Sequence, residues 1–439
     1  MVVLYSDIVK HINKAVDKNL EKEKLWKKLQ PKSPYDDIRF RKYISDLLKL
    51  VEGFLALQIY EENPLNRASN LIEAVGRKGM EKLYASTMRT ARRISENQPY
   101  RGADYYYFQY EIERNYYNLI RLDERRTEQT NEDKIIRHLD YFYLSEKLRL
   151  FCSILSRSHV VKSEDSNLFF REVIEYMKKL KVDDIPAVSI YYHVYLTQTD
   201  EENAEHYEKL KNLLKENYHL FSSEQAYEMY TFAMNYCIRG LNKTGKKFFI
   251  EELFYFYKEL LSNKLMIRGG ELSPWRFNNI VTTALRLKEY EWTSQFIDKY
   301  QNYLPVKLRG NAVSHSLAQL FFYQKRFDDV VAELRNVEFE DLNYHLNSRA
   351  MLIATYYETE EIEPLYSMFG SFTAYLKRNK MITAGRKENF LNLIKFTKKL
   401  DKLRRRDKEA LRKLKETVTN SRVSSKKWLL EKIDEKLNR

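Results

Sequence analysis

The chain has 439 residues, of which 44% are hydrophobic and 31% are charged, and its formal net charge is +14. This balance excludes a wholly disordered chain and leaves enough apolar side chains for a sizeable core. Only 11 glycines and 8 prolines are present, which disfavours turn-rich β folds. We therefore expect an all-α protein, built either as several domains or as one elongated array of helices.

The first residues and the cysteines bear on the location of the protein. The N-terminal stretch MVVLYSDIVKHINK carries charges where a secretory signal needs an apolar run. No uncharged apolar stretch approaches the roughly 18 residues of a membrane span. Cys152 and Cys237 have no partner at CxxC spacing and lie in aromatic-rich helical patterns, so we interpret them as buried apolar side chains. We expect a cytoplasmic protein with no membrane partner.

Helix-period apolar patterns follow one another along the chain and are separated by short polar joints that contain Pro, Gly or Asn. No low-complexity linker interrupts them between about residues 35 and 380. We divide the chain into N-terminal helices at 1–100, irregular helix-pair repeats at 101–270, three further repeats at 271–382 and a basic helical C-terminal segment at 383–439. Within the second part we expect helix pairs at about 134–182, 186–218 and 222–263.

Six tyrosines lie in the stretch ADYYYFQYEIERNYYN, residues 103–118. On a helix, one arc contains the apolar side chains of Tyr105, Phe108, Ile112, Tyr116, Leu119 and Ile120, which is the width of a core face. Tyr106, Tyr110 and Tyr117 occupy the adjoining arc and widen the apolar surface. We interpret this width as that of a helix contacted on two sides. The alternative is that Tyr106, Tyr110 and Tyr117 line a groove used for stacking or peptide contact.

The string GLNKTGKK imitates a phosphate-binding loop, because Gly240, Gly245 and Lys246 have GxxxxGK spacing. The next position holds Lys247 instead of the hydroxyl residue that binds Mg²⁺, and the preceding segment is helical rather than a strand. We predict a helix-ending glycine turn with Gly240 as the cap.

One pattern occurs three times between Ser273 and about Lys380. The residue that opens the second helix of each copy is Tyr290, Phe327 or Ile362, so the spacings are 37 and 35 residues. Core residues recur at fixed offsets from this opening residue. They are Val281, Ala318 and Ile353 nine before it, Thr293, Val330 and Leu365 three after it, Ile297, Leu334 and Phe369 seven after it, and Tyr300, Val337 and Phe372 ten after it.

A period in the mid-thirties, built as helix, short turn and helix, resembles the tetratricopeptide repeat (TPR). Pro305 supplies the closing proline of that pattern in the first copy. Large residues such as Val281 and Leu365 stand where the family has small ones, so these repeats are degenerate. The resemblance implies a right-handed α-solenoid of TPR-like helix pairs. The whole chain also resembles a group of bacterial helical-repeat proteins of uncharacterised function.

In TPR proteins the first helix of each pair lines a concave face that binds partners. The resemblance therefore implies a non-catalytic scaffold that binds a protein or peptide. The positions matching that lining are Asn278, Thr282, Arg286, His315, Gln319, Tyr323 and Asn347. A solvated inner face without a ligand explains the same polar residues.

The positive charge is concentrated at the C-terminal end. Residues 386–439 contain 19 Lys and Arg against 8 Asp and Glu, whereas the remainder of the chain is nearly neutral. Leu400, Leu403, Leu411 and Leu414 recur at helical spacing, which predicts amphipathic helices docked on the last repeat. Candidate phosphate contacts of a nucleic-acid partner are Lys398, Lys399, Lys402, Arg404, Arg405, Arg406, Arg412 and Lys413. A solvated basic cap is the alternative.

Catalytic and metal-binding patterns are absent from the sequence. No two of the eight histidines have the i, i+3 or i+4 spacing of helical metal ligands, and neither cysteine has a neighbouring ligand. No GxSxG nucleophile motif occurs. We expect a protein that is not an enzyme and that needs no cofactor or metal.

Overall fold

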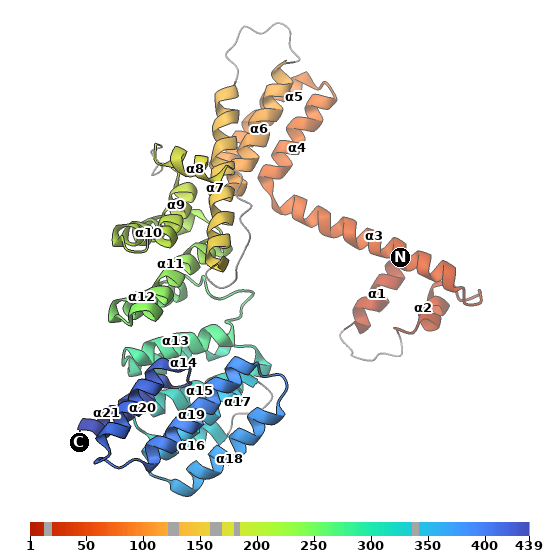
Figure 1. Ribbon diagram of the computed structural model, residues 1–439. Helices are drawn as coiled ribbons and strands as arrows, with labels where there is room; N and C mark the ends of the chain where they lie inside the picture. Colours follow the sequence, from red (N-terminus) through yellow and green to blue (C-terminus); the bar gives the residue numbers. More distant parts are fainter. Residues whose placement is uncertain (13–19, 122–130, 159–168, 180–184, 336–341, 439) are drawn as a thin grey trace. The chain divides into compact units, whose positions relative to one another are not determined.

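The computed structural model describes residues 1–12, 20–121, 131–158, 169–179, 185–335 and 342–438 (Figure 1). Within these residues the regular elements are all helices, so the predicted all-α class is confirmed. None of the helices described combines the length and the apolar character needed to cross a membrane. The chain forms two compact units, Met1–Gln225 and Ala226–Arg439.

In its described residues the first unit contains ten complete α-helices and the start of an eleventh. They are α1 (Val2–His11), α2 (Lys22–Leu29), α3 (Asp37–Glu62), α4 (Pro64–Arg77), α5 (Glu81–Glu96), α6 (Ala103–Arg121), α7 (Glu132–Ser158), α8 (Phe170–Met177), α9 (Pro186–Thr199), α10 (Ala204–Asn217) and α11 (Ser223–Thr244). The helices α9 and α10 match the predicted pair at 186–218. The predicted pair at 134–182 corresponds to α7 and α8, and its residues 159–168 and 180–182 lie outside the described part of the chain.

The first three helices form a small core of their own. Leu4, Leu25, Trp26 and Phe40 are buried in it. Asp36 caps α3, because its carboxylate accepts hydrogen bonds from the backbone N–H groups of the second and third residues of the helix, both at 3.0 Å. Only the first half of α3 contributes side chains to this core.

The tyrosine-rich helix α6 is contacted on two sides, as predicted. Its predicted core face packs with α4 and α5 in a cluster that includes Tyr105, Phe108, Ile112, Tyr116 and Leu119. On the other side it packs against α7. The side chain of Ile120, which was predicted to belong to the same face, lies outside the described residues.

The described part of the second unit continues α11 and adds ten α-helices. They are α12 (Lys247–Ser262), α13 (Pro274–Arg286), α14 (Tyr290–Tyr300), α15 (Val306–Tyr323), α16 (Phe327–Arg335), α17 (Leu342–Glu358), α18 (Ile362–Arg378), α19 (Ala384–Lys402), α20 (Lys408–Asn420) and α21 (Lys426–Asn438). Tyr290, Phe327 and Ile362 begin α14, α16 and α18, so the predicted starts of the three second helices are confirmed.

The three predicted repeats share one turn between their helices. A residue with positive φ stands two positions before each second helix: Lys288 at 65°, Lys325 at 62° and Glu360 at 58°. The backbone N–H of the following residue donates back to the carbonyl of Ala284, Phe321 or Tyr356, at 3.0, 2.9 and 3.0 Å. This is the Schellman pattern, which satisfies the last carbonyls of a helix and reverses the chain in few residues.

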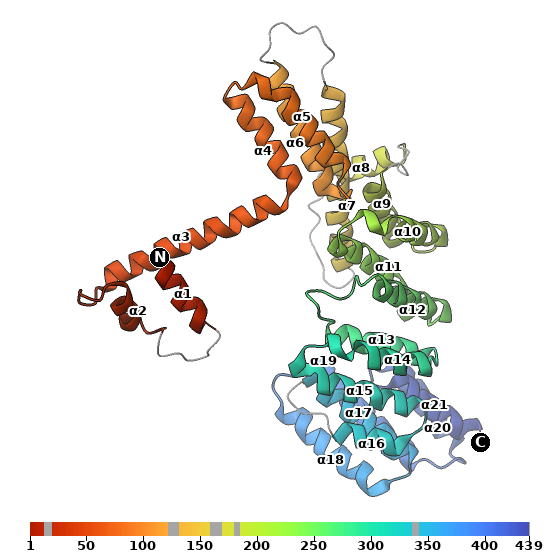
Figure 2. The same ribbon diagram turned by 180° about the vertical axis from the view of Figure 1, so that it is seen from behind.

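First helices of successive pairs pack on one another, α13 on α15 and α15 on α17 (Figures 1 and 2). The arrangement is compatible with a helical-repeat fold. Of the predicted core positions, Tyr300 is half-buried and Val337 lies outside the described residues. The other ten are buried, namely Val281, Thr293, Ile297, Ala318, Val330, Leu334, Ile353, Leu365, Phe369 and Phe372.

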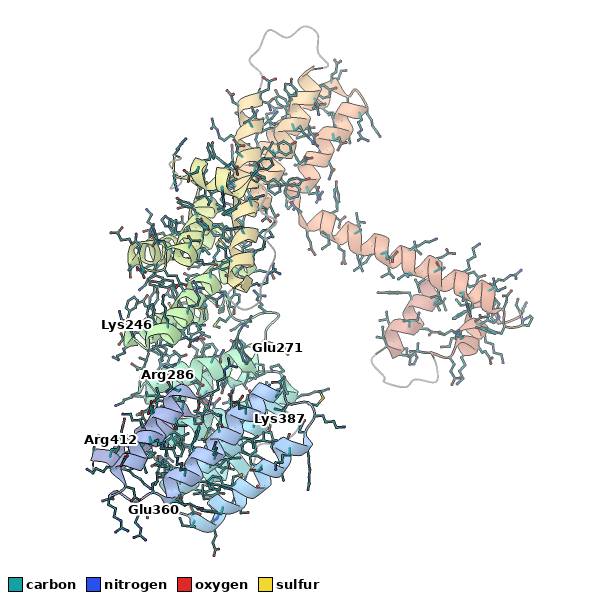
Figure 3. The ribbon with its side chains drawn as sticks, in the orientation of Figure 1. Lys246, Glu271, Arg286, Glu360, Lys387 and Arg412 are labelled. Atoms are coloured by element: carbon teal, nitrogen blue, oxygen red, sulfur yellow. The ribbon has the colours of Figure 1, made fainter. Side chains whose placement is uncertain are left out.

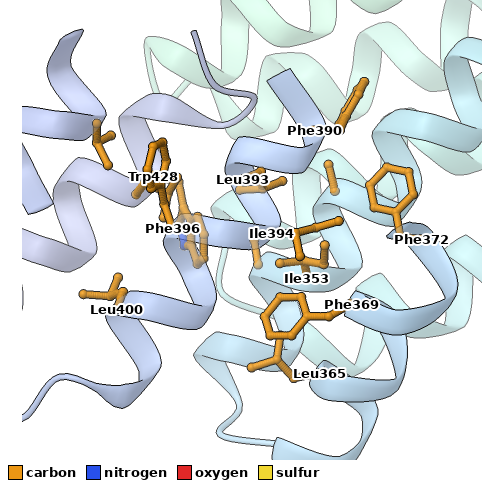
Figure 4. Close-up of a cluster of buried hydrophobic side chains, with 14 of the residues drawn as sticks. Ile353, Leu365, Phe369, Phe372, Phe390, Leu393, Ile394, Phe396, Leu400 and Trp428 are labelled. Carbon is orange, nitrogen blue, oxygen red and sulfur yellow. The ribbon is translucent and has the colours of Figure 1, made fainter. Parts of the chain in front are cut away.

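The basic C-terminal segment shares its core with the last repeat. Figure 4 shows side chains of α17, α18, α19 and α21 gathered in one cluster, among them Ile353, Phe369, Phe390 and Trp428. Leu400, Leu411 and Leu414 are buried in the same cluster, and Leu403 packs against it. The predicted docking of this segment is therefore confirmed. The predicted boundary between residues 382 and 383 lies inside this core, and the four-part division remains a prediction.

The predicted glycine cap at Gly240 is wrong. The helix α11 continues past it to Thr244, and Gly245 follows with a positive φ of 68°. Gly240 instead contacts α12, because a Cβ atom there would lie 2.4 Å from the ring of Phe249. The glycine therefore serves close helix packing, whereas Gly245 makes the turn.

We expect Phe369→Ala to lower the free energy of unfolding of the second unit by about 3–5 kcal/mol, because its fully buried ring fills the core of Figure 4. Urea unfolding of the full chain, followed by circular dichroism, measures this change. Ile362→Ala on the same helix is the control, because its side chain is half exposed, and its effect should stay below about 1 kcal/mol. Equal effects of the two substitutions would contradict the assigned core.

Candidate partner-binding groove

Three successive first helices and the last helix enclose a groove of about 530 Å³ in the second unit. We call it the α13–α21 groove. Its walls include Asn278 and Thr282 of α13, His315, Gln319 and Tyr323 of α15, Asn347, Met351 and Glu358 of α17, and Trp428, Glu431, Lys432 and Glu435 of α21. The two sides therefore come from parts of the chain that are far apart in the sequence.

Six of the seven residues predicted for the partner-binding face line this groove, namely Asn278, Thr282, His315, Gln319, Tyr323 and Asn347. The seventh, Arg286, is exposed near the end of α13 and is not among the lining residues (Figure 3). Its positive charge acts on Tyr323 and partly offsets the effect of burial, which raises the pKa of that phenol. The helical register of the repeats thus places these side chains together, whatever their role.

A hydrogen-bonded cluster of polar side chains joins α13 to α15 in the groove. The amide nitrogen Nε2 of Gln319 donates to Oδ1 of Asn278 at 2.7 Å, and Oγ1 of Thr282 donates to Oε1 of Gln319 at 3.1 Å. Both ends of the Gln319 amide are therefore held. An amide fixed in this way presents its remaining donor and acceptor positions in a defined direction.

His315 lies under the groove rather than projecting into it, since only 2% of its surface is exposed. Its Nδ1 lies 3.4 Å from Oγ of Ser348, and its ring packs edge-on against Tyr344 at a centroid distance of 5.3 Å. Burial lowers the pKa of His315 to about 4. The imidazole is therefore neutral near pH 7 and contributes packing and hydrogen bonding.

The helix α21 forms the wall that the sequence interpretation missed. Nε1 of Trp428 donates to Oε1 of Glu358 at 2.7 Å, and Nζ of Lys432 donates to Oε2 of the same carboxylate at 2.8 Å. Trp428 also packs edge-on against Tyr357. The Glu358 carboxylate thus fixes α21 to α17 across 70 and 74 residues of sequence. The one signal in the sequence was Trp428, the only tryptophan of the predicted C-terminal segment.

A strongly basic surface covers the end of α19, the turn after it and α20 (Figure 3, where Arg412 is labelled). Lys398 is half-buried, with its ammonium 5.1 Å from the ring centre of Phe369. The other seven residues of the predicted set are exposed, namely Lys399, Lys402, Arg404, Arg405, Arg406, Arg412 and Lys413. We call these seven the basic surface. Among the residues that the structure describes, none of the seven forms an ion pair with a carboxylate.

The three tyrosines considered for a groove in the first unit differ in exposure. Tyr106 is buried between Tyr105 and Tyr141, whose ring centres lie 5.3 and 5.4 Å away, so its ring is a packing group. Burial raises the pKa of Tyr106 to about 12. Tyr110 and Tyr117 are half-buried, and the guanidinium of Arg114 lies over the Tyr110 ring at 5.3 Å. A groove role for Tyr110 and Tyr117 remains a prediction.

Within the described residues, no group of three or more His, Cys, Asp or Glu side chains is close enough to hold a metal ion. Cys152 and Cys237 are buried free thiols. Comparisons of the chain with protein-family models, with curated proteins and with solved structures find no match. The assignment of a repeat type therefore depends on the residue pattern and on the helix pairs described above.

The buried His315 predicts a pH dependence of stability. Its pKa is about 4 in the folded chain, against an ordinary value of 6.5, so the unfolded chain binds more protons between these values. The contribution of the neutral, buried His315 to the free energy of unfolding is complete above pH 6.5 and is lost as the pH falls toward 4. This lowering of the pKa amounts to about 3 kcal/mol of stability.

We expect His315→Asn to flatten the stability curve between pH 6.5 and 4 by roughly this amount, because asparagine does not titrate. Urea unfolding at a series of pH values measures the two slopes. His345, whose pKa is lowered to about 4 by burial and by Arg349, keeps a slope of the same sign in the variant. Equal slopes in the wild type and the variant would show that His315 is not buried as described.

Proposed function

We propose that this chain is a non-catalytic scaffold, a right-handed α-solenoid of TPR-like helix pairs, that binds a peptide segment of a protein partner. The binding site is the α13–α21 groove. The observation that carries the proposal is that equivalent positions of three successive first helices converge on this one groove. The solenoid and its repeat type are inferred in part by analogy with the TPR family, and so is the role of the groove.

The size of the groove favours a short segment over the surface of a folded domain. Its volume of about 530 Å³ lies within the range of roughly 300–1,000 Å³ that is typical of sites for compact ligands. A peptide strand or a single helical turn presents side chains and main-chain amides that such a space can enclose.

The chemistry of the walls favours a peptide of mixed character. Three carboxylates, Glu358, Glu431 and Glu435, stand among the lining residues together with three ammonium groups, Lys325, Lys427 and Lys432. The formal charges of these side chains balance, so the groove selects neither a strongly acidic nor a strongly basic ligand. The amides of Asn278 and Gln319 offer both donors and acceptors, which suits a peptide main chain. Tyr323 and Trp428 add aromatic surface.

We expect the double variant Tyr323→Ala, Asn347→Ala to weaken peptide binding at least tenfold. Both side chains are exposed in the groove, so their removal leaves the core intact. The probe is a peptide selected by the wild-type full chain from a displayed random library, with its Kd measured by fluorescence anisotropy. The control is Gln295→Ala, Tyr366→Ala, which removes similar exposed side chains from α14 and α18.

Equal affinities of the wild type and the groove variant, or equal losses in the two variants, would place the peptide elsewhere. A library that yields no binder to the wild type would count against the proposal as well. The cytoplasmic location and the absence of catalysis remain predictions from the sequence.

A second candidate function is binding to nucleic acid through the basic surface. The supporting observation is that its seven exposed cations have no carboxylate partner among the described residues. Such cations attract phosphates, and their binding releases counterions, so the affinity must fall steeply with salt. A solvated cap explains the same residues without any ligand.

We expect the triple variant Arg404→Gln, Arg405→Gln, Arg406→Gln to reduce the slope of log K against log salt for a duplex oligonucleotide by about 3. Titrations at several salt concentrations measure the slope. The control replaces Lys243, Lys246 and Lys247 by glutamine, three exposed lysines at the α11–α12 turn. The same slope in the variant and the wild type, or no binding by the wild type, would leave the basic surface as a cap.

A further inference from the structure

The second half of α3 exposes a concentration of large apolar side chains. Six residues between 48 and 59 are each 51–67% exposed, namely Leu48, Leu50, Phe54, Leu55, Leu57 and Ile59. The small core that α3 forms with α1 and α2 takes up only Phe40, Tyr43 and Leu47 from the first half of the helix. The neighbouring cluster formed by α4, α5 and α6 includes no residue of this second half.

The exposed residues do not form a single stripe. At 100° per residue, Leu48, Leu55 and Ile59 share one face, whereas Leu50, Phe54 and Leu57 lie on the opposite face. The second of these faces continues the row of Phe40, Tyr43 and Leu47 that α1 and α2 cover. A helix with apolar side chains on two faces needs more cover than one neighbour supplies, and an exposed apolar face marks an interaction site.

The face that α1 and α2 leave uncovered has opposite charges at its two ends. Along it lie Arg41, then the apolar residues Ile44, Leu48, Val51, Leu55 and Ile59 with the exposed Glu52 among them at the centre, then Glu62. Arg41 forms an ion pair with Asp37 at 2.7 Å and is otherwise exposed. Glu62 is exposed and forms no ion pair among the described residues. We call this row the α3 stripe.

We propose that the α3 stripe binds the same stripe of a second copy of this chain in an antiparallel helix pair. The centre of the stripe lies between Val51 and Glu52. An antiparallel pair about this point brings Arg41 opposite Glu62, Ile44 opposite Ile59, and Leu48 opposite Leu55, each twice. The stripe is therefore complementary to itself in its end charges and in the apolar pairs of Ile44 with Ile59 and Leu48 with Leu55, and Val51 faces Glu52 at the centre. A partner of different sequence needs no such match between the two ends of one stripe, which is why we choose a second copy.

The first test compares the full chain with Leu48→Glu, Leu55→Glu by sedimentation velocity over a range of concentrations. We expect a dimer for the wild type and a monomer for the variant, because the substitutions place four carboxylates at the centre of the interface. The control is Leu71→Glu, Leu83→Glu, which alters two exposed leucines of α4 and α5 and should leave a dimer. Circular dichroism checks that all three proteins fold.

The second test examines the antiparallel order. Arg41→Glu and Glu62→Arg each place like charges opposite one another, so each single variant should dimerise at least fivefold more weakly. The double variant restores opposite charges only in an antiparallel pair, and its dimer should regain wild-type affinity. In a parallel pair each residue faces its own equivalent, so neither the single variants nor the double variant would change the pairing of charges, and no loss or recovery of affinity would be seen.

Any of three results would overturn the proposal. They are a wild type that is monomeric at every concentration, a Leu48→Glu, Leu55→Glu variant that still dimerises, or a double charge variant whose dimer affinity does not recover. Hydrogen exchange of a monomeric wild type would then reveal whether another part of the same chain protects α3, and flotation with phosphatidylcholine vesicles would reveal whether a lipid surface does. The inference does not depend on the proposed peptide binding, since the α3 stripe and the groove belong to different units.

Discussion

A pair of antiparallel helices has two apolar faces and can cover only one of them by its own contact, so each pair in the second unit depends on the next pair. This constraint explains the burial of residues such as Val281, Ile353 and Leu365 in the second unit. It also explains why the chain cannot end at α18. The last pair has an open face, and the core of Phe369 and Phe372 is completed by α19, α20 and α21.

The charge of the C-terminal segment follows from the same constraint. Its leucines face the core, so its lysines and arginines must lie outside, and burying them unpaired would cost far more than the helix gains. Two cations that come close to the core bond to oxygen atoms. Lys432 bonds the carboxylate of Glu358, and Lys436 donates to the carbonyl oxygens of Leu400 and Leu403 at 2.8 and 3.2 Å. The groove is a consequence of this closure, because α21 reaches Glu358 and stands opposite α13 and α15.

The local features of the fold were accessible from the sequence, whereas the contacts between distant segments were not. Apolar periodicity located the starts of α14, α16 and α18 because each begins a regular helix packed on its neighbour. The turns before them carry Lys288, Lys325 and Glu360 in the left-handed region, where glycine would have been the recognisable signal. The prediction for Gly240 failed because that glycine does not end a helix. It allows close packing against the ring of Phe249. Six lining residues of the groove followed from the repeat register. The wall formed by α21 could not be predicted in this way, because the hydrogen bond from Trp428 to Glu358 joins residues that are 70 positions apart in the sequence.

Two helices of the first unit, α6 and α3, have the same packing requirement but meet it in different ways. Both α6 and α3 have apolar surface that is wider than one neighbour can cover. For α6, the neighbours α4, α5 and α7 supply the contacts, and tyrosines serve there because their rings fill space while half-buried hydroxyls still meet water or polar groups. For α3, the exposed side chains are leucine, isoleucine and phenylalanine, which have no polar group to place at a wet edge. Residues of this type belong against another apolar surface, and the opposite charges at the two ends of the α3 stripe select its own copy as that surface.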